Sequence, residues 1–309
     1  MTGGRQRIVV TGATGAIGRP LCAALIANGY DVVVLSRDAA SARQRAPGAT
    51  EYRTWTPEVI GDWTNALDGA YAVVHLAGAP VFSRRWSRAY KTRIYTSRVL
   101  STRALVSAMD QVKTPPAVFV SSSGVGYYGY HDDDAKLTEH APPGTDFLAR
   151  VCVDWERVAM RAEARGIRTV VLRTGIVLDA RDGPLPQMLL PYRFFAGGPI
   201  LPGNQWVSWI HLEDQIGLIR LTLEDPRAQG PLNAVAPDAR RNADFSRAIG
   251  QIAHSPAWFP TPRWILRAIF GERADILTTG QRVVPAKAVD LGYTFQYPHL
   301  EQALRQLLR

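Results

Sequence analysis

Short apolar runs alternate with amphipathic stretches along the chain up to about residue 175. Strands are predicted by the apolar runs at residues 8–10, 32–35, 51–55, 71–76, 117–120 and 169–172. Helices are predicted by apolar residues at helical spacing over residues 15–28, 57–67, 86–109 and 147–165. Strands that alternate with helices indicate an α/β protein with a doubly wound parallel sheet.

Three glycines follow the first predicted strand directly, at Gly12, Gly15 and Gly18. A pyrophosphate needs free backbone N–H groups at a helix N-terminus and no Cβ in its way. Gly12 suits the tight turn, Gly15 the close approach and Gly18 the helix-to-strand packing. Glycines also serve plain turns, which is the alternative. The order strand, turn, helix, strand favours a dinucleotide site at Gly12, Thr14, Gly15, Ala16, Ile17 and Gly18.

The end of the second predicted strand bears on which dinucleotide is bound. An acidic residue there favours NAD, but the chain reads Ser36-Arg37. A guanidinium fork fits a 2′-phosphate and Ser36 can donate a further hydrogen bond, so we expect NADP. Two observations keep the alternative open: Arg37 is one arginine among many, and the acidic Asp38 follows it.

The pattern changes near residue 180, where glycine and proline pairs interrupt short apolar pieces. We expect a dinucleotide-binding domain over residues 1–180 and a smaller mixed, mainly helical lobe over residues 181–309 that faces the substrate. Residues 205–236 partly return to the first domain, as a strand at 209–211, a helix at 213–222 and an edge strand at 232–235. A last helix is predicted over residues 300–308.

Composition excludes several classes of protein. The net charge of +9 comes from arginines scattered along all 309 residues, which speaks against nucleic-acid binding and suits anionic ligands. No apolar run is long enough for a membrane span, and no apolar stretch precedes the first strand. Cys22 and Cys152 are too few for a disulfide framework or a metal site, so we expect a cytoplasmic protein. Residues 132–134, three aspartates, suit a solvated loop better than a metal site.

Further motifs give the chain a resemblance to the extended short-chain dehydrogenase/reductase superfamily, whose fold is Rossmann-like. They are HLAG at 75–78, the serine run after the fifth strand and WIHLED at 209–214. Within it, the chain is most similar to an atypical, epimerase-like branch with a helical C-terminal domain of unknown function. The stretches that carry this closer likeness are SGVGYYG at 123–129, DWE at 154–156, LRTGIVL at 172–178, QWVSWIH at 205–211, NAVAP at 233–237 and GQRVVP at 280–285.

The resemblance implies where the cofactor lies. Leu76, Ala77 and Gly78 are expected along the adenine and ribose. The nicotinamide end is expected to border Arg173, Thr174, Gly175 and Ile176, because ligands of such sheets lie at the carboxyl ends of the strands. The alternative is that Ala77-Gly78 is an ordinary strand exit and His75 a core histidine with satisfied hydrogen bonds.

The acid/base pair of the superfamily, a tyrosine and a lysine four residues later, is missing. The resemblance places Leu148 and Cys152 at the two positions, and leucine cannot transfer a proton. It also matches Ser122 and Ser123 to the serine that polarises the substrate. Tyr128 is our candidate proton donor. The alternative is that Tyr128 and its neighbour Tyr127 only pack against the cofactor or shape the pocket.

Trp86 and Trp206 are candidate walls of a substrate pocket, with core packing as the alternative for both. These features together predict an NADP-dependent oxidoreductase or epimerase acting on a small polar substrate, with sugar nucleotides among the candidates. Ser123 and Tyr128 serve in place of the missing pair. A non-catalytic NADPH-binding or sensing protein is the alternative, supported by the loss of that pair. Analogy with the superfamily adds a homodimer through two long helices of each subunit.

Overall fold

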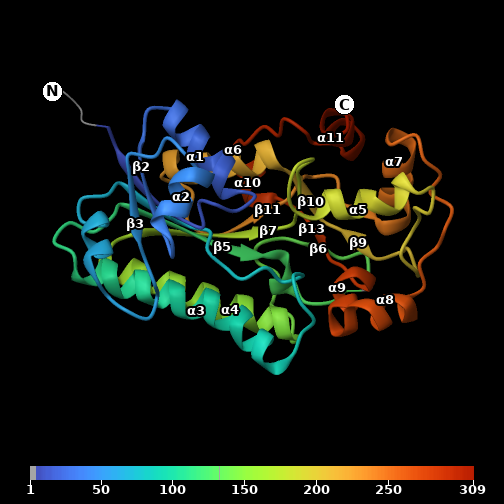
Figure 1. Cartoon of the computed structure of the whole chain (residues 1–309), viewed down its shortest axis with the longest axis horizontal. Coiled ribbons are helices and arrows are strands. Elements are labelled where there is room, and N and C mark those ends of the chain that lie inside the picture. Colours follow the sequence, from blue (N-terminus) through green and yellow to red (C-terminus); the bar gives the residue numbers. More distant parts are fainter. Residues whose placement is uncertain (1–4, 132) are drawn as a thin grey trace.

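A seven-stranded parallel sheet forms the centre of the computed structural model, which describes residues 5–131 and 133–309. Its strand order is β11-β7-β5-β4-β1-β2-β3 (Figure 1). The strands are β1 (Arg7–Thr11), β2 (Asp31–Ser36), β3 (Glu51–Thr54), β4 (Ala72–His75), β5 (Val118–Gly124), β7 (Arg168–Thr174) and β11 (Gly230–Ala234). The chain starts in the middle of the sheet, runs to one edge and returns to build the other, which confirms the doubly wound prediction. The reversal between β1 and β4 is where such sheets bind ligands.

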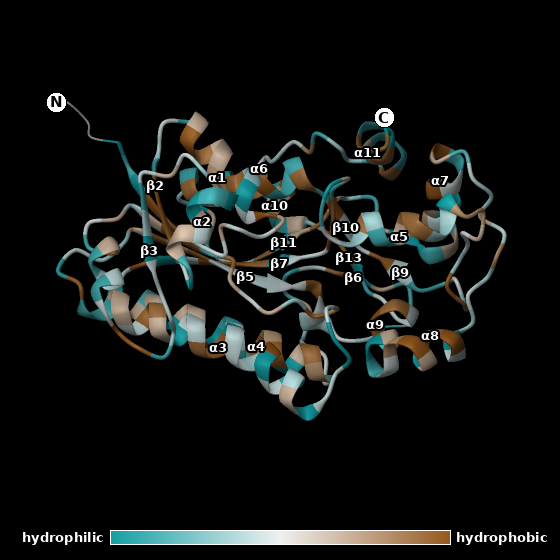
Figure 2. Ribbon diagram, viewed as in Figure 1, coloured by the Kyte–Doolittle hydropathy of each residue, from teal (hydrophilic) through white to brown (hydrophobic). Residues whose placement is uncertain are grey.

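Helices cover both faces of the sheet. In Figure 1, one face carries α1 (Gly18–Ala27), α2 (Ala39–Arg45), α6 (Leu212–Glu224) and α10 (Ala286–Asp290), and the other carries α3 (Arg88–Gln111) and α4 (Phe147–Ala159). Side chains of a strand alternate between faces, so Ile8 and Val10 pack with Leu21 of α1, while Val9 packs with Leu105 of α3. Strands buried on both faces read as continuous apolar runs, and Figure 2 shows them as brown ribbons inside the sheet.

Some predicted elements differ in extent. The first helix begins at Gly18 instead of residue 15, because the preceding residues form the glycine turn. The helix predicted over 57–67 is wrong apart from a short 3-10 helix, η1 (Asp62–Ala66), since Gly61 in the middle of this segment adopts extended backbone. The fourth helix changes into a 3-10 helix, η3 (Met160–Arg165), and ends at Gly166, whose φ is +71°.

The C-terminal part is mainly helical and has a core of its own, around Trp209, Phe245 and Leu304. Its helices are α5 (Pro184–Arg193), α7 (Asn242–Ile252), α8 (Arg263–Phe270), η4 (Gly271–Arg273), α9 (Ala274–Thr278) and α11 (Leu300–Leu307). Two two-stranded sheets join it to the rest: β8 (Ile176–Leu178) with β10 (Trp209–His211), and β6 (Lys136–Leu137) with β13 (Arg282–Val283). A third, β9 (Trp206–Val207) with β12 (Arg240–Arg241), lies within the C-terminal part. The domain boundary at residue 180 stays a prediction.

Both cysteines, Cys22 and Cys152, are buried and free. Within the described residues, no helix is both long and apolar enough to cross a bilayer. No group of three or more potential metal-binding side chains occurs in that same part of the chain. Of the aspartate run named above, Asp132 lies outside the described residues, and the other two belong to the loop before β6.

His75, at the carboxyl end of β4, is fully buried and has both ring nitrogens occupied. Nδ1 lies 2.6 Å from Thr11 Oγ1, and Nε2 lies 3.1 Å from Ser101 Oγ. His75 is thus the satisfied core histidine of the alternative view. Burial, with a smaller contribution from the Arg98 charge, lowers the pKa of its imidazole from 6.5 to about 3.

This buried imidazole makes the fold sensitive to acid. Below pH 6.5 His75 becomes protonated in the unfolded chain, whereas in the folded chain it stays neutral down to about pH 3. The free energy of unfolding therefore falls as the pH drops from 6.5 to about 3. We expect His75 to contribute a loss of up to about 1.4 kcal/mol per pH unit. Urea unfolding of wild type and His75→Gln at pH 7, 6 and 5 measures it: the variant loses stability less steeply. Parallel slopes would contradict the expectation.

Candidate dinucleotide site

The glycine turn lies between β1 and α1, against the exit of β4. Gly12 has φ +71°, and a Cβ on it would lie 2.7 Å from the Leu76 carbonyl carbon. A Cβ on Gly18 would lie 2.2 Å from the Gly12 carbonyl oxygen. At Gly15, by contrast, a Cβ would meet only that same oxygen, at 3.3 Å. The first and third glycines are therefore required by packing, and a Cβ at the second would make one tight contact with no other such atom within 4 Å. This is a cradle into which a pyrophosphate fits.

Ser36 and Arg37, at the end of β2, are the polar residues predicted to bind a 2′-phosphate. Arg37 is exposed, and Ser36 is half-buried with its hydroxyl accepting from the Asp38 N–H at 3.4 Å. The Asp38 carboxylate caps α2 by accepting from the Ser41 N–H at 2.9 Å. Because this carboxylate already holds a helix N-terminus, the argument that it binds ribose hydroxyls is weakened. Arg45, which sequence reasoning missed, adds a second guanidinium 3.5 Å from the Thr14 carbonyl oxygen.

The strand exit at Leu76, Ala77 and Gly78 is tied to both neighbours. The Leu76 N–H donates to the Thr11 carbonyl oxygen at 3.2 Å, which holds the exit beside the glycine turn. One residue beyond Gly78, the Ala79 N–H donates to Ser97 Oγ on α3 at 2.9 Å. The predicted adenine and ribose segment thus lies between the turn and α3.

An ion pair buried between β7 and α4 supports the next part of the carboxyl edge. Arg173 donates to Glu156 from Nε at 3.0 Å and from Nη2 at 2.9 Å, and the two side chains are only 4% and 9% exposed. Ser123 donates to the same carboxylate at 2.6 Å. Arg173 and Ser123, both predicted as site residues, therefore meet through Glu156. Sequence reasoning gave Glu156 no role of its own, although it is the only acidic residue on the buried face of α4.

Tyr128 lies in the interior, 1% exposed, on the 3-10 helix η2 (Val125–Tyr128). Its hydroxyl donates to Asn233 Oδ1 at 2.6 Å and accepts from Arg173 Nη1 at 3.0 Å. Burial raises the pKa of this phenol, and Arg173 opposes the rise. Tyr127 packs over the same guanidinium, whose carbon lies 3.4 Å from the ring centroid. The geometry gives Tyr128 a place in a buried network and argues against the proton donor that the sequence suggested.

Asn233, at the edge strand β11, links this network to the C-terminal part of the chain. Its Nδ2 donates to the Val284 carbonyl oxygen at 2.9 Å, and its backbone N–H donates to Glu139 Oε1 at 3.0 Å. Glu139 in turn accepts from the Lys287 N–H at 3.2 Å. The segments around residues 128, 139, 233 and 284–287 therefore meet here, and no local pattern in the sequence predicts this contact.

The segment after β7 runs along the same edge. Thr174 pairs with Gly124 at the end of β5. The Gly175 N–H donates to the Ala234 carbonyl oxygen at 3.1 Å, and a Cβ on Gly175 would lie 2.7 Å from the Ser208 carbonyl oxygen. Ile176 donates its N–H to that oxygen at 2.9 Å. The sheet thus brings this predicted nicotinamide border beside the serine run.

The two positions of the missing acid/base pair lie on α4. Leu148 is half-buried and lies next to Gly126, where a Cβ would come within 3.4 Å of the leucine Cβ. Cys152 is buried, and burial, then Glu156, raises the pKa of its thiol to about 11. Neither side chain can exchange protons near neutral pH. Ser122 is the half-buried serine of the run, at the carboxyl end of β5.

The predicted pocket tryptophans lie apart from these residues. Trp206 packs against two guanidinium groups, whose carbons lie 4.2 Å (Arg241) and 4.5 Å (Arg282) from the ring centroid. Its indole N–H donates to the Asp133 carbonyl oxygen at 3.2 Å. The ring of Trp206 is thus engaged in two cation–π contacts, which argues against the substrate-pocket wall predicted from the sequence.

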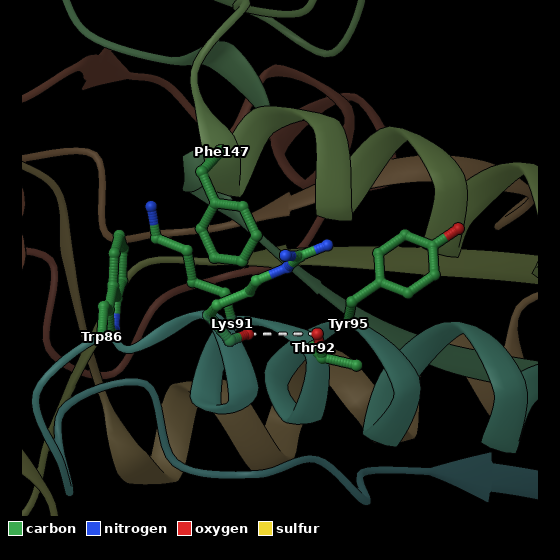
Figure 3. Close-up of a pocket in the computed structure, with 6 residues that line it drawn as sticks. Trp86, Lys91, Thr92, Tyr95 and Phe147 are labelled. Carbon is green, nitrogen blue, oxygen red and sulfur yellow. Dashed lines mark hydrogen bonds between the residues drawn. The ribbon is translucent and has the colours of Figure 1, made fainter.

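Trp86 lines a shallow groove, but one formed by α3, the residues before it and the start of α4. Figure 3 shows Lys91 rising between Trp86 and Phe147, with its Nζ 5.6 Å and 5.1 Å from the two ring centroids. The groove is lined by Trp86, Arg88, Lys91, Thr92, Tyr95 and Phe147. Among the described residues, none of the glycine turn or the serine run contributes to it. The structure thus places Trp86 at this groove.

A glycine turn facing the chain reversal of a parallel seven-stranded sheet defines the class of Rossmann-fold dinucleotide-binding proteins. The comparison with protein families agrees with this class. The chain belongs to the NAD dependent epimerase/dehydratase family, which it matches over residues 8–235. Residues 261–307 match a domain of unknown function, DUF1731. The resemblance drawn from the motifs is confirmed.

Relatives of the chain occur in a plant, in bacteria and in mammals. The chain is 37% identical to the chloroplastic epimerase family protein SDR39U1 homolog of Arabidopsis thaliana, over 99% of this chain and 87% of the relative. It is 36% identical to the epimerase family protein YfhF of Bacillus subtilis, over 98% of each. The crystal structure of human epimerase family protein SDR39U1 with NADPH superposes with a TM-score of 0.86 and 34% identity, over 98% of this chain and 99% of the human one. The NADPH in that human structure agrees with the NADP cofactor expected from Arg37.

Proposed function

We propose that the chain binds NADPH at the glycine turn and acts as an oxidoreductase or epimerase on a small polar substrate. The observation that carries the proposal is the cradle at Gly12, Gly15 and Gly18, with Arg37 beyond it and Asp38 withdrawn into a helix cap. The NADPH of the human relative, at 34% identity over nearly the whole chain, supports the same cofactor. Neighbours in complex with UDP-sugars and NAD, such as the UDP-glucuronic acid 4-epimerase of Bacillus cereus, are 18% identical and support the fold alone.

Each part of the site has a role in this proposal. The glycine turn would hold the pyrophosphate, Ser36 and Arg37 the 2′-phosphate, and the strand exit at Leu76 the adenosine. When bound, NADPH supplies a hydride for exchange with a substrate carbonyl carbon. Ser122 is the group that we assign to polarise the substrate, because Ser123 already donates to Glu156. Tyr128 and Arg173 hold this edge in shape instead of exchanging protons.

A second candidate function is NADPH binding without turnover, as in a sensor. It is favoured by one structural observation: Leu148, Cys152 and the buried Tyr128 hydroxyl offer no proton donor at the positions that the resemblance singles out. A cytoplasmic location and a homodimer remain predictions, and the Arabidopsis relative is named as chloroplastic.

The two functions are separated by binding and turnover measured on the same protein. NADPH binding by calorimetry comes first, followed by NADPH oxidation with a panel of carbonyl compounds and by epimerisation of UDP-sugars. For an enzyme we expect Ser122→Ala to lower kcat at least about tenfold with an unchanged NADPH Kd. Ser107→Ala, a half-buried serine of α3, is the control. Tight NADPH binding without turnover on the whole panel would favour the sensor, and no binding of either reduced coenzyme would overturn both.

A further inference from the structure

Exposed apolar side chains gather in two segments of the C-terminal part, residues 184–203 and 251–270. These segments carry eight of the thirteen large apolar side chains that are exposed in the part of the chain that the structure describes. The eight are Leu190, Phe194, Phe195, Leu201, Trp258, Phe259, Trp264 and Ile269. Single exposed apolar residues are ordinary on a protein surface, but a gathering of them marks an interaction site.

The two segments lie side by side. The Phe259 N–H donates to the Gly197 carbonyl oxygen at 3.1 Å. The Trp258 indole N–H donates to the Phe195 carbonyl oxygen at 3.2 Å, which fixes a ring that is nevertheless exposed. Figure 1 places α5, α7 and α8, which these segments contain or join, at the end of the molecule opposite β3. We call Phe194, Phe195, Trp258 and Phe259 the aromatic patch.

The same two segments are positively charged. They contain Arg193, Arg263 and Arg267 and no aspartate or glutamate. Arg193 directly precedes the aromatic patch and is exposed, and no carboxylate oxygen of the described residues lies within 4.0 Å of its guanidinium. Arg263 and Arg267, on α8, share one carboxylate, that of Asp275, at 2.9 Å and 3.1 Å. Positive charge is therefore left over on the segments that carry the patch.

This composition matches the surface of a bilayer that contains anionic lipids. Tryptophan and phenylalanine rings are favourable at the level of the headgroups, and arginines beside them attract the lipid phosphates. A symmetric pairing of two copies through the same surface is disfavoured, because it would bring arginines against arginines with no carboxylate of these segments to pair with them. Charge and residue type together thus favour a membrane over a second copy of the chain.

We propose that the aromatic patch docks the protein on bilayers that contain anionic lipids. The rings of Phe194 and Phe259, 74% and 53% exposed, enter the headgroup region, and Arg193 binds lipid phosphate. Docking through loop side chains of this kind is peripheral and reversible. The inference goes beyond the proposed function and does not depend on whether the chain turns over a substrate.

Co-sedimentation with vesicles tests the proposal. One set of vesicles is phosphatidylcholine alone, and the other contains about one third phosphatidylglycerol. We expect wild type to bind the anionic vesicles at least about tenfold more tightly, with an affinity that falls as the salt concentration rises. Phe194→Ser/Phe259→Ser loses at least about tenfold of this affinity. Its matched control, Val59→Ser/Ile60→Ser, removes two exposed apolar side chains outside the patch and changes the affinity less than about twofold.

Arg193→Gln tests the electrostatic part of the docking. We expect it to weaken binding to the anionic vesicles about threefold to fivefold, whereas Arg161→Gln, an exposed arginine of η3, changes this binding less than about twofold. All the substituted side chains are exposed, so each variant keeps the Tm of wild type.

The proposal is overturned if wild type binds neither kind of vesicle, if it binds both equally, or if the two double variants lose affinity alike. Docking of a second copy on the aromatic patch gives a different result. Sedimentation velocity then shows a wild-type dimer that Phe194→Ser/Phe259→Ser converts to monomers, and wild type does not bind vesicles. This outcome would assign the patch to an interface between two copies and would also overturn docking on a membrane.

Discussion

Glu156→Gln is expected to destabilise the fold by about 3–5 kcal/mol, because it leaves the Arg173 guanidinium buried without its counter-charge. The carboxylate accepts two hydrogen bonds from Arg173 and one from Ser123. An amide has only one oxygen to accept, so at least one donor of this network loses its partner. The expected result is a lower urea midpoint with an unchanged m-value.

Glu163→Gln is the matched control, since this carboxylate is exposed. We expect it to change stability by less than about 0.5 kcal/mol. The double variant Glu156→Gln/Arg173→Met regains part of the loss, as it removes the stranded cation together with its partner. A Glu156→Gln protein as stable as the control would contradict the role assigned to this ion pair.

Arg37→Ala is expected to weaken NADPH binding by about 10- to 100-fold and to leave NADH binding within about twofold. A charge-assisted hydrogen bond to phosphate contributes about 1.5–3 kcal/mol, and each 1.4 kcal/mol changes Kd about tenfold. Calorimetric titration of both coenzymes at fixed salt measures the change in preference. Arg43→Ala is the control, because Arg43 packs over Tyr52. Equal losses for NADPH and NADH would mean that Arg37 does not read the 2′-phosphate.

The sheet could be predicted because its strands are buried on both faces and therefore appear as apolar runs. The runs at residues 8–10 and 32–35 fall inside β1 and β2. The helix predicted over residues 57–67 failed, since one glycine with extended backbone stops a helix that local spacing favours. The spacing of apolar residues along the chain does not show that the backbone at Gly61 is extended.

The candidate site, too, could be predicted from the sequence only in part. Its backbone features are local, so the glycine turn and the Ser36-Arg37 pair were found from the sequence. The side-chain network was not, because Glu156, Arg173 and Asn233 meet only through tertiary contacts.

The hydrogen bonds of Asn233 have a consequence for how the chain holds together. This amide on the last strand of the sheet is completed by a carbonyl group from residue 284, far beyond the segment that matches the epimerase family. Loss of the segment after residue 260 would remove the nearer of the two acceptors of this amide nitrogen and leave it only the Leu137 carbonyl oxygen, at 3.4 Å. We therefore expect removal of the carboxyl-terminal portion to weaken the edge of the sheet as well.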